Sequence, residues 1–244
     1  MASTMTDAIA GAFRLGDVFS KTFAIFGRRF APFIVLTVIV KIPEYVALIA
    51  MEASGIGPLS GWRSAAIFVT LICSTIVNGA VVYGVLQELR GHTFSIGESI
   101  QVALQRLLPM IGLALWVGFL TVISGFLLFF PALIVMCRYY VALPACVAEQ
   151  IGVSSSLSRS AFLTKGYRWQ VLGMLILIFI GGAIIEGILW LIFRASGPVA
   201  LQIALQPVLA IVGAFNGVIV GVYYYQLRVA KEGVDIDRIA SVFD

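Results

Sequence analysis

Charged residues are scarce in this 244-residue chain. Asp, Glu, Lys and Arg together make up 11% of it, whereas 61% of its residues are hydrophobic. A soluble domain usually carries about 25% charged residues. The chain therefore has too few polar side chains to cover a water-facing surface, and its solvent must be lipid. This deficit excludes an ordinary soluble domain and points to an integral membrane protein.

The residues of common catalytic and metal sites are equally few. His92 is the single histidine, and three cysteines (Cys73, Cys137 and Cys146) lie inside apolar runs with no CxxC or Cys/His spacing. Cysteines in such a context usually pack as small, buried hydrophobic residues. The sequence contains no GxSxG, P-loop or GxGxxG motif. We therefore expect no catalytic residues, no cofactor and no metal site, and we interpret the protein as non-enzymatic.

Long apolar runs are what the sequence has in abundance. Each is long enough to cross about 30 Å of hydrocarbon as a helix. The uncharged run from Leu107 to Cys137 is too long for one crossing, so we divide it near residues 125–130 and place Pro131 in the first turn of the fourth span. The six predicted spans cover approximately residues 32–51, 64–86, 108–125, 131–147, 170–193 and 199–225.

Most basic residues fall on one side of these six spans. The loops on the opposite side contain only Arg63 and Arg194. The positive-inside rule then places both termini in the cytoplasm. Anionic lipid explains the basic face without a nucleic acid, so membrane lipids are the expected partners. Twelve basic residues make up this face: Arg14, Lys21, Arg28, Arg29, Arg90, Arg106, Arg159, Lys165, Arg168, Arg228, Lys231 and Arg238.

An amphipathic helix is predicted just before the first span, over Phe13–Phe30. Its basic polar face and phenylalanine-rich apolar face are typical of a helix lying in a membrane interface; packing on a soluble core is the alternative. We expect Lys21 and Arg28 to face the cytoplasm, and a helix collinear with the first span would contradict this assignment. Three phenylalanines should face lipid or the helix bundle: Phe19, Phe23 and Phe26.

This amphipathic segment has a counterpart later in the chain. FRLGDVFSKTF, which begins at Phe13, aligns with FSIGESIQVAL, which begins at Phe94, and ALQR at 103–106 resembles SLSR at 156–159. We therefore predict three units, each a cytoplasmic interfacial helix followed by a two-span hairpin. Chance similarity between short amphipathic helices is the alternative. The units cover residues 13–87, 94–148 and 153–228, and a cytoplasmic tail covers 229–244.

Four charged residues fall within the predicted spans: Lys41, Glu44, Arg138 and Glu186. Each costs about 2.5–3.5 kcal/mol at mid-bilayer on insertion scales, so each should face protein or water. Counting along the helices places Glu44 and Arg138 at similar depths, which predicts a buried pair, with Lys41 reaching the interface or Glu186. The cluster is either a structural ion pair or a polar cavity for an ion, a proton or a lipid headgroup.

Glycines recur at intervals of four in the sixth span, at Gly213, Gly217 and Gly221. Such a small-xxx-small stripe permits close approach of a second helix. The second helix belongs either to the same chain or to a partner, which includes a second copy of this protein.

Residues 143–177 resemble the membrane-domain family of glycerophosphoryl diester phosphodiesterases and related bacterial inner-membrane proteins of uncharacterised function. RLGDVFSKTFAIF near the N-terminus and YYYQLRVAKEGVDIDRIASVFD at the C-terminus also resemble this family. Its hydrolase chemistry belongs to a separate barrel domain that this chain lacks, so no catalytic residue carries over. The resemblance is most specific at Pro144, Glu149, Arg159, Ser160, Leu163, Thr164, Gly166 and Trp169.

The resemblance implies a six-helix protein of the bacterial inner membrane with a role in phospholipid or envelope biology. We therefore interpret the chain as a lipid-interacting or scaffold protein, with or without a protein partner. A transporter or channel that uses the four intramembrane charges is the alternative, and an intramembrane enzyme acting on lipid ranks third.

Overall fold

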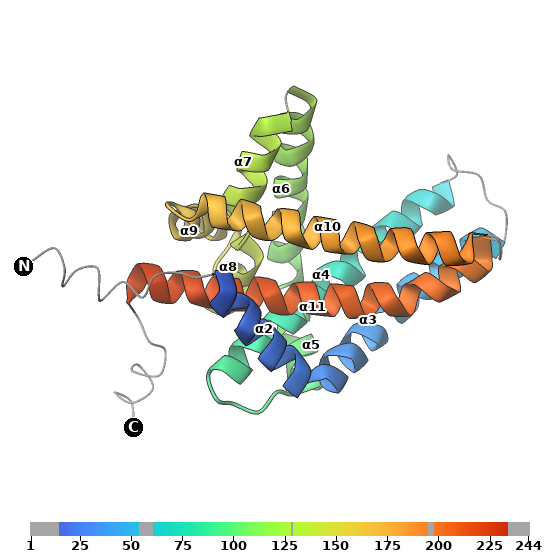
Figure 1. Ribbon diagram of the computed structural model, residues 1–244, viewed down its shortest axis with the longest axis horizontal. Helices are drawn as coiled ribbons and strands as arrows, with labels where there is room; N and C mark the ends of the chain where they lie inside the picture. Colours follow the sequence, from blue (N-terminus) through green and yellow to red (C-terminus); the bar gives the residue numbers. More distant parts are fainter. Residues whose placement is uncertain (1–14, 54–60, 128, 195–197, 234–244) are drawn as a thin grey trace, which may run out of the picture.

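The computed structural model describes residues 15–53, 61–127, 129–194 and 198–233, and the regular elements in these ranges are all α-helices (Figure 1). The predicted all-α fold is confirmed. In chain order the helices are α2 (Leu15–Arg28), α3 (Phe30–Ala53), α4 (Gly61–Leu89), α5 (Ile96–Gln105), α6 (Leu107–Leu127), α7 (Phe129–Tyr139), α8 (Ala142–Glu149), α9 (Val153–Thr164), α10 (Arg168–Phe193) and α11 (Pro198–Glu232).

Six segments of the described chain are long and apolar enough to span a membrane, which confirms the six predicted spans. Helices suit hydrocarbon because each satisfies its own backbone hydrogen bonds. The chain is therefore a polytopic membrane protein. Its candidate spans are Phe30–Met51, Ala65–Leu89, Leu107–Phe126, Phe130–Glu149, Arg168–Phe193 and Leu205–Glu232.

Three shorter helices precede the three pairs of spans: α2 comes before α3 and α4, α5 before α6 and α7, and α9 before α10 and α11. At the start of α5, the Ser95 hydroxyl accepts a hydrogen bond from the Glu98 amide at 3.4 Å. The order of elements agrees with the three predicted units. An internal repeat in the sequence stays a prediction, and residues 234–244 of the predicted tail lie outside the described residues.

The chain changes direction between α2 and α3, at Arg29 (Figure 1). The amphipathic helix is therefore not collinear with the first span. Val18 and Phe26 of α2 are buried, whereas Lys21 and Arg28 are exposed, which confirms the predicted polar and apolar faces. The position of α2 in a membrane interface stays a prediction.

The fourth candidate span is broken, since α7 ends at Tyr139 and α8 begins at Ala142. The predicted fourth span, residues 131–147, is therefore present but is built from two helices. Pro144 explains the break. It has no amide proton to donate to the Tyr140 carbonyl, and its ring would clash with that carbonyl in a continuous helix. In the first turn of α8 the same proline is well tolerated.

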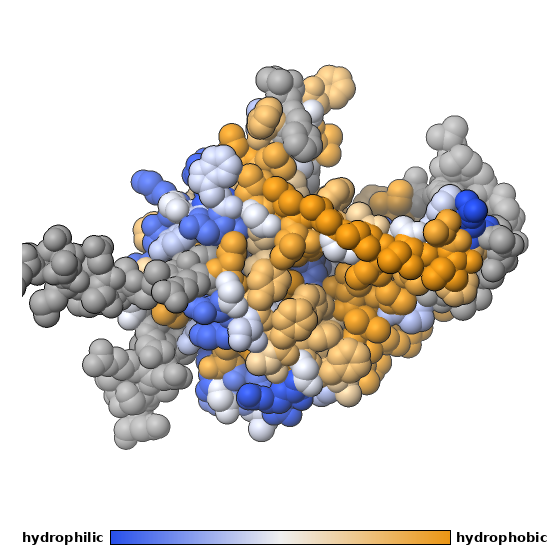
Figure 2. Space-filling view, viewed as in Figure 1, coloured by the Kyte–Doolittle hydropathy of each residue, from blue (hydrophilic) through white to orange (hydrophobic). Residues whose placement is uncertain are grey.

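The shorter helices gather at one end of the molecule, together with the end of α11. We call this the basic end; it comprises α2, α5, α8, α9 and residues 224–232 of α11. At the far end, where α6 meets α7 and α10 meets α11, the α6–α7 hairpin diverges from α10 and α11 (Figure 1). Hydrophilic residues gather at the basic end, and an apolar surface covers α10 and α11 (Figure 2).

The helix α11 is central, because it packs against α2, α3, α4, α8, α9 and α10. Its 35 residues extend about 52 Å, far more than the hydrocarbon thickness of about 30 Å. Its charged last turns lie at the basic end, and Tyr223, Tyr224 and Leu227 are buried just before or within them.

Candidate functional site

An apolar cavity of about 370 Å³ lies between α2, α10 and α11. The amphipathic helix α2 contributes three phenylalanines to its lining: Phe19, Phe23 and Phe26. Leu177, Gly181 and Ile185 line it from α10, and Phe215 and Asn216 from α11. Asn216 is the single polar residue of the lining, so the cavity suits an apolar ligand.

The cavity exists because aromatic rings hold α2 on α11 while α10 fills little of the remaining space. The Phe215 ring centroid lies 5.1 Å from that of Phe23 and 5.2 Å from that of Phe26, and the second pair is edge-to-face. On α10, a Cβ added at Gly181 or Gly182 would meet no atom within 4 Å. Phe23 is nevertheless 62% exposed, so the cavity is open to the surroundings.

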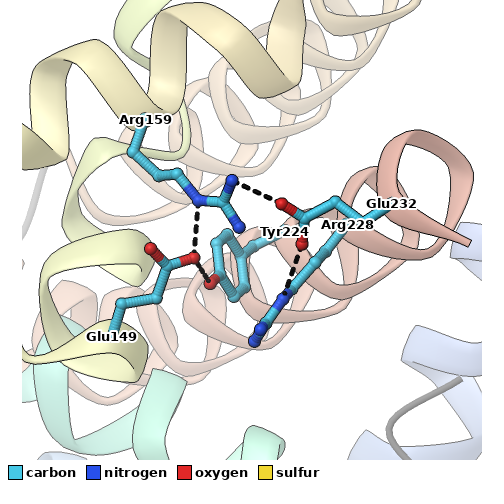
Figure 3. Close-up of polar contacts among 5 residues, drawn as sticks. All are labelled: Glu149, Arg159, Tyr224, Arg228 and Glu232. Carbon is cyan, nitrogen blue, oxygen red and sulfur yellow. Dashed lines mark hydrogen bonds and ion pairs between the residues drawn. The ribbon is translucent and has the colours of Figure 1, made fainter. Parts of the chain in front are cut away.

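A network of charged side chains ties α8, α9 and α11 together at the basic end (Figure 3). One oxygen of Glu149 accepts hydrogen bonds from Arg159 Nε at 2.7 Å and from the Tyr224 hydroxyl at 2.7 Å. Arg159 also contacts Glu232 through its Nη1 at 2.5 Å. Arg228 Nε donates to the other Glu232 oxygen at 3.0 Å. With two acids and two bases, the network is neutral.

Arg159 is the centre of this network. Its hydrogen bond to Glu232 is the main cause of a raised pKa, and the bond to Glu149 adds to it, so the guanidinium keeps its charge. Glu149 and Arg159 were predicted as site residues from the sequence, whereas Tyr224, Arg228 and Glu232 were not. The family resemblance covers both residues 143–177 and the C-terminal segment, and these two segments meet in the network. This shared resemblance was the signal that could have suggested the missing residues.

The helix α9 has a buried stripe of hydroxyl groups, Ser156, Ser160 and Thr164. Ser160 Oγ donates to the Arg138 carbonyl at 2.9 Å, and Thr164 Oγ1 lies 3.2 Å from the same oxygen. That carbonyl lies just before the α7–α8 break, so the hydroxyls compensate for a helical hydrogen bond that the break removes.

The other residues of the family-like segment lie around this network. Pro144 is buried in the first turn of α8. Gly166 joins α9 to α10 with φ +92°, a conformation that other residues rarely adopt. Trp169 is 83% exposed at the start of α10. These three residues therefore shape the turns and the surface and take no part in the network.

The four intramembrane charged residues do not form a single cluster. Lys41 Nζ lies 3.2 Å from Glu44 Oε1, one turn along the same helix. The predicted Glu44–Arg138 pair is wrong, because α3 packs on α4 and α11 and not on α7. Arg138 is exposed beside the Tyr139 ring, and its carbonyl accepts a hydrogen bond from Ser160 of α9. Glu186 is exposed on α10.

The glycine stripe of α11 is partly covered by the same chain. A Cβ at Gly217 would lie 2.8 Å from a methyl of Val81, and one at Gly221 would lie 3.1 Å from a methyl of Val85. A Cβ at Gly213 would meet nothing within 4 Å. The stripe therefore serves the packing of α4 on α11, and contact with another chain through it stays a prediction.

Within the described residues, no group of three or more His, Cys, Asp or Glu side chains is placed to hold a metal ion. Comparisons of the chain with protein-family models, with curated proteins and with solved structures give no match.

Proposed function

We propose that this chain is a non-enzymatic, lipid-binding protein of the bacterial inner membrane. The observation that carries the proposal is the apolar cavity of about 370 Å³ between α2, α10 and α11. Its volume falls within the range of about 300–1,000 Å³ typical of small-molecule sites. A single acyl chain of a phospholipid is the occupant that this nearly uniform apolar lining favours.

The position of α2 supports the same ligand. One face of α2 lines the cavity, and Lys21 is exposed on the other, with its Nζ 5.8 Å from the Tyr225 ring centroid. An interfacial helix of this kind places apolar groups at acyl-chain depth and cations at headgroup depth. The acyl chain therefore enters beneath α2 while the phosphate stays at the basic end, which we place in the cytoplasm with both termini.

The family resemblance fits this role, since it points to phospholipid or envelope biology. A scaffold role, in which the basic end binds a protein partner, belongs to the same proposal. The transport alternative has one observation in its favour: Glu44 Oε2 is buried without a hydrogen-bond partner among the described residues. The four charges that it requires lie apart, however, so we rank it second.

Photocrosslinking tests the lipid proposal. The purified protein in liposomes is irradiated with a phosphatidylglycerol that carries a diazirine midway along one acyl chain, and the adducts are mapped by mass spectrometry. We expect adducts at cavity residues, with Phe215 and Ile211 foremost. Gly181 lines the cavity, and a Cβ added there would meet no atom within 4 Å. Gly181→Leu should therefore fill part of the cavity and reduce the adducts about tenfold, the equivalent of about 1.4 kcal/mol.

Gly118→Leu is the matched control. Gly118 is exposed on α6, away from the cavity, and a Cβ there also meets nothing within 4 Å. This variant should keep the wild-type labelling of the cavity. Cavity labelling that Gly181→Leu leaves unchanged, or labelling spread evenly over all lipid-facing helices, would overturn the proposal.

A further inference from the structure

Two arginines are left without a counter-ion where α7 meets α10. Arg138 lies in the last turn of α7, and Arg168 is the first residue of α10. Both are exposed, and no ion pair or hydrogen bond to either guanidinium occurs among the described residues. Cζ of Arg138 lies 5.5 Å from the centroid of the Tyr139 ring, but a neutral ring does not balance its charge.

The turn between α9 and α10 brings the two arginines to one place. Thr164 Oγ1, in the last turn of α9, lies 3.2 Å from the Arg138 carbonyl oxygen, and α10 begins four residues later at Arg168. The helices α7 and α10 pack against each other. The Arg168 guanidinium lies within electrostatic range of the thiol of Cys137, the residue before Arg138. Two like charges are therefore held at one seam.

The surrounding helices supply no free acid to this seam. Glu149 of α8 and Glu232 of α11 both bind Arg159. In the described parts of α7, α9 and α10, the single acidic residue is Glu186, which lies eighteen residues, about 27 Å, along α10 from Arg168. The seam therefore attracts an anion from outside the chain. A phosphate suits it, because its oxygens match the paired N–H groups of arginine.

An exposed apolar stripe leads away from Arg138 along α7. Phe130, Ile134 and Arg138 follow one another at intervals of four residues, so they share one face of the helix. Phe130 is 73% exposed and Ile134 is 56% exposed. On the other side of the seam, Trp169 next to Arg168 is 83% exposed. Cations at one end of an exposed apolar stripe match a phospholipid, which has a phosphate at one end and acyl chains at the other.

We infer that the seam between α7 and α10 binds an anionic phospholipid, with its phosphate between Arg138 and Arg168 and one acyl chain along Ile134 and Phe130. The phosphate then lies where the span of α10 begins, and basic sites between membrane helices at such a level bind anionic headgroups. A zwitterionic headgroup would bring an ammonium group toward two guanidiniums. An acidic protein segment would match the charges but would leave the apolar stripe uncovered.

This site is separate from the cavity and needs only the membrane setting of the proposed function. Gly181 lines the cavity from α10. Arg168 lies thirteen residues before it, about 20 Å along the helix and about 140° around it. The two sites can therefore hold different lipid molecules, and either can be lost without the other.

Native mass spectrometry of the full chain in detergent tests the headgroup. Dioleoyl phosphatidylglycerol and dioleoyl phosphatidylcholine have the same acyl chains and are titrated separately. The wild type should bind phosphatidylglycerol about tenfold more tightly, since two arginines face its net negative headgroup. The double variant Arg138→Gln/Arg168→Gln should bind both lipids equally, at the affinity for phosphatidylcholine.

Arg28→Gln/Arg90→Gln is the matched control, because it removes the same charge from two exposed arginines elsewhere in the chain. It should keep the tenfold preference for phosphatidylglycerol. Equal loss of the preference in both double variants would mean that overall charge attracts the lipid, and it would overturn the inference. Equal binding of the two lipids by the wild type would also overturn it and would favour an acidic protein segment at the arginines.

Photocrosslinking in liposomes locates the bound lipid. A phosphatidylglycerol with a diazirine midway along one acyl chain should label Ile134 and Phe130 of α7, and Arg138→Gln/Arg168→Gln should reduce these adducts about tenfold while leaving those in the cavity unchanged. Cavity adducts without α7 adducts would overturn this second site and leave the proposed function standing. Adducts on α7 without cavity adducts would do the reverse.

Discussion

The two ends of the helix bundle are held together in different ways. At the basic end, polar side chains bridge successive helices. At the far end, most described side chains are apolar and exposed; Phe126, at the end of α6, is 94% exposed. Four sets of polar contacts lie in the basic end or join it to α4: Arg29–Glu88 at 2.9 Å, Tyr83–Glu98 at 2.5 Å, Arg106–Gln150 at 2.9 Å, and the network around Arg159.

This difference follows from the solvent. Apolar contacts contribute little to helix association in a membrane, because lipid tails are as apolar as leucine. Hydrogen bonds, ion pairs and close packing against glycine must then specify the arrangement. They are concentrated at the basic end and along α4 and α11.

The largest expected effect is at the centre of the basic end. Arg159→Gln removes the guanidinium that joins Glu149 to Glu232 and leaves them with Tyr224 and Arg228 as partners. We expect the free energy of unfolding to fall by about 3 kcal/mol. Unfolding by SDS in mixed micelles, followed by circular dichroism, measures it. Arg168→Gln is the control, since Arg168 is exposed and outside the network; equal stability of the two variants would show that the network does not hold α9 to α11.

A smaller effect is expected along the glycine stripe, which continues the packed region toward the far end. Gly217→Leu forces a side chain into Val81 of α4, and such overpacking costs about 1–3 kcal/mol. At Gly213, one turn away on the same helix, an added Cβ would meet no atom within 4 Å, so Gly213→Leu should leave stability within about 0.5 kcal/mol of wild type. The same SDS titration measures the free energy of unfolding of both variants. A reversed order would mean that α4 does not pack on α11 as the structure shows.

The same contrast explains what the sequence could predict. Apolar runs and amphipathic periods depend on local composition, so the six spans, the break between the third and fourth, and the faces of α2 were all predictable. The network around Arg159 was only partly predictable. Glu149 and Arg159 belong to a recognisable segment, but Tyr224 and Glu232 reach them through folding that brings residues 75 and 73 positions away into contact.

The errors have local physical causes. The Glu44–Arg138 pair was inferred from depth along the helices, which says nothing about which helices are neighbours. Lys41, one turn from Glu44, satisfies the acid without any interhelical contact. The break before Pro144 was missed because a proline can lie in the first turn of a new helix as well as within an old one.

An effect of about 1 kcal/mol is expected where α9 meets the broken span. Ser160→Ala removes the buried hydroxyl that donates to the Arg138 carbonyl at 2.9 Å, and a hydrogen bond of this kind contributes about 1 kcal/mol. Ser158→Ala, an exposed position on the same helix, is the matched control and should change nothing measurable. If Ser160→Ala is as stable as the control, the stripe of hydroxyl groups does not stabilise the break.

The smallest effect is expected at the far end. Phe→Ala in a packed core costs about 3–5 kcal/mol, but Phe126 is 94% exposed, so Phe126→Ala should change the free energy of unfolding by less than about 0.5 kcal/mol. The measurement is made once in dilute detergent and once in densely loaded liposomes. A loss of stability only at high density would mean that another chain covers the end of α6, so the far end would be open in the monomer and closed in the assembly.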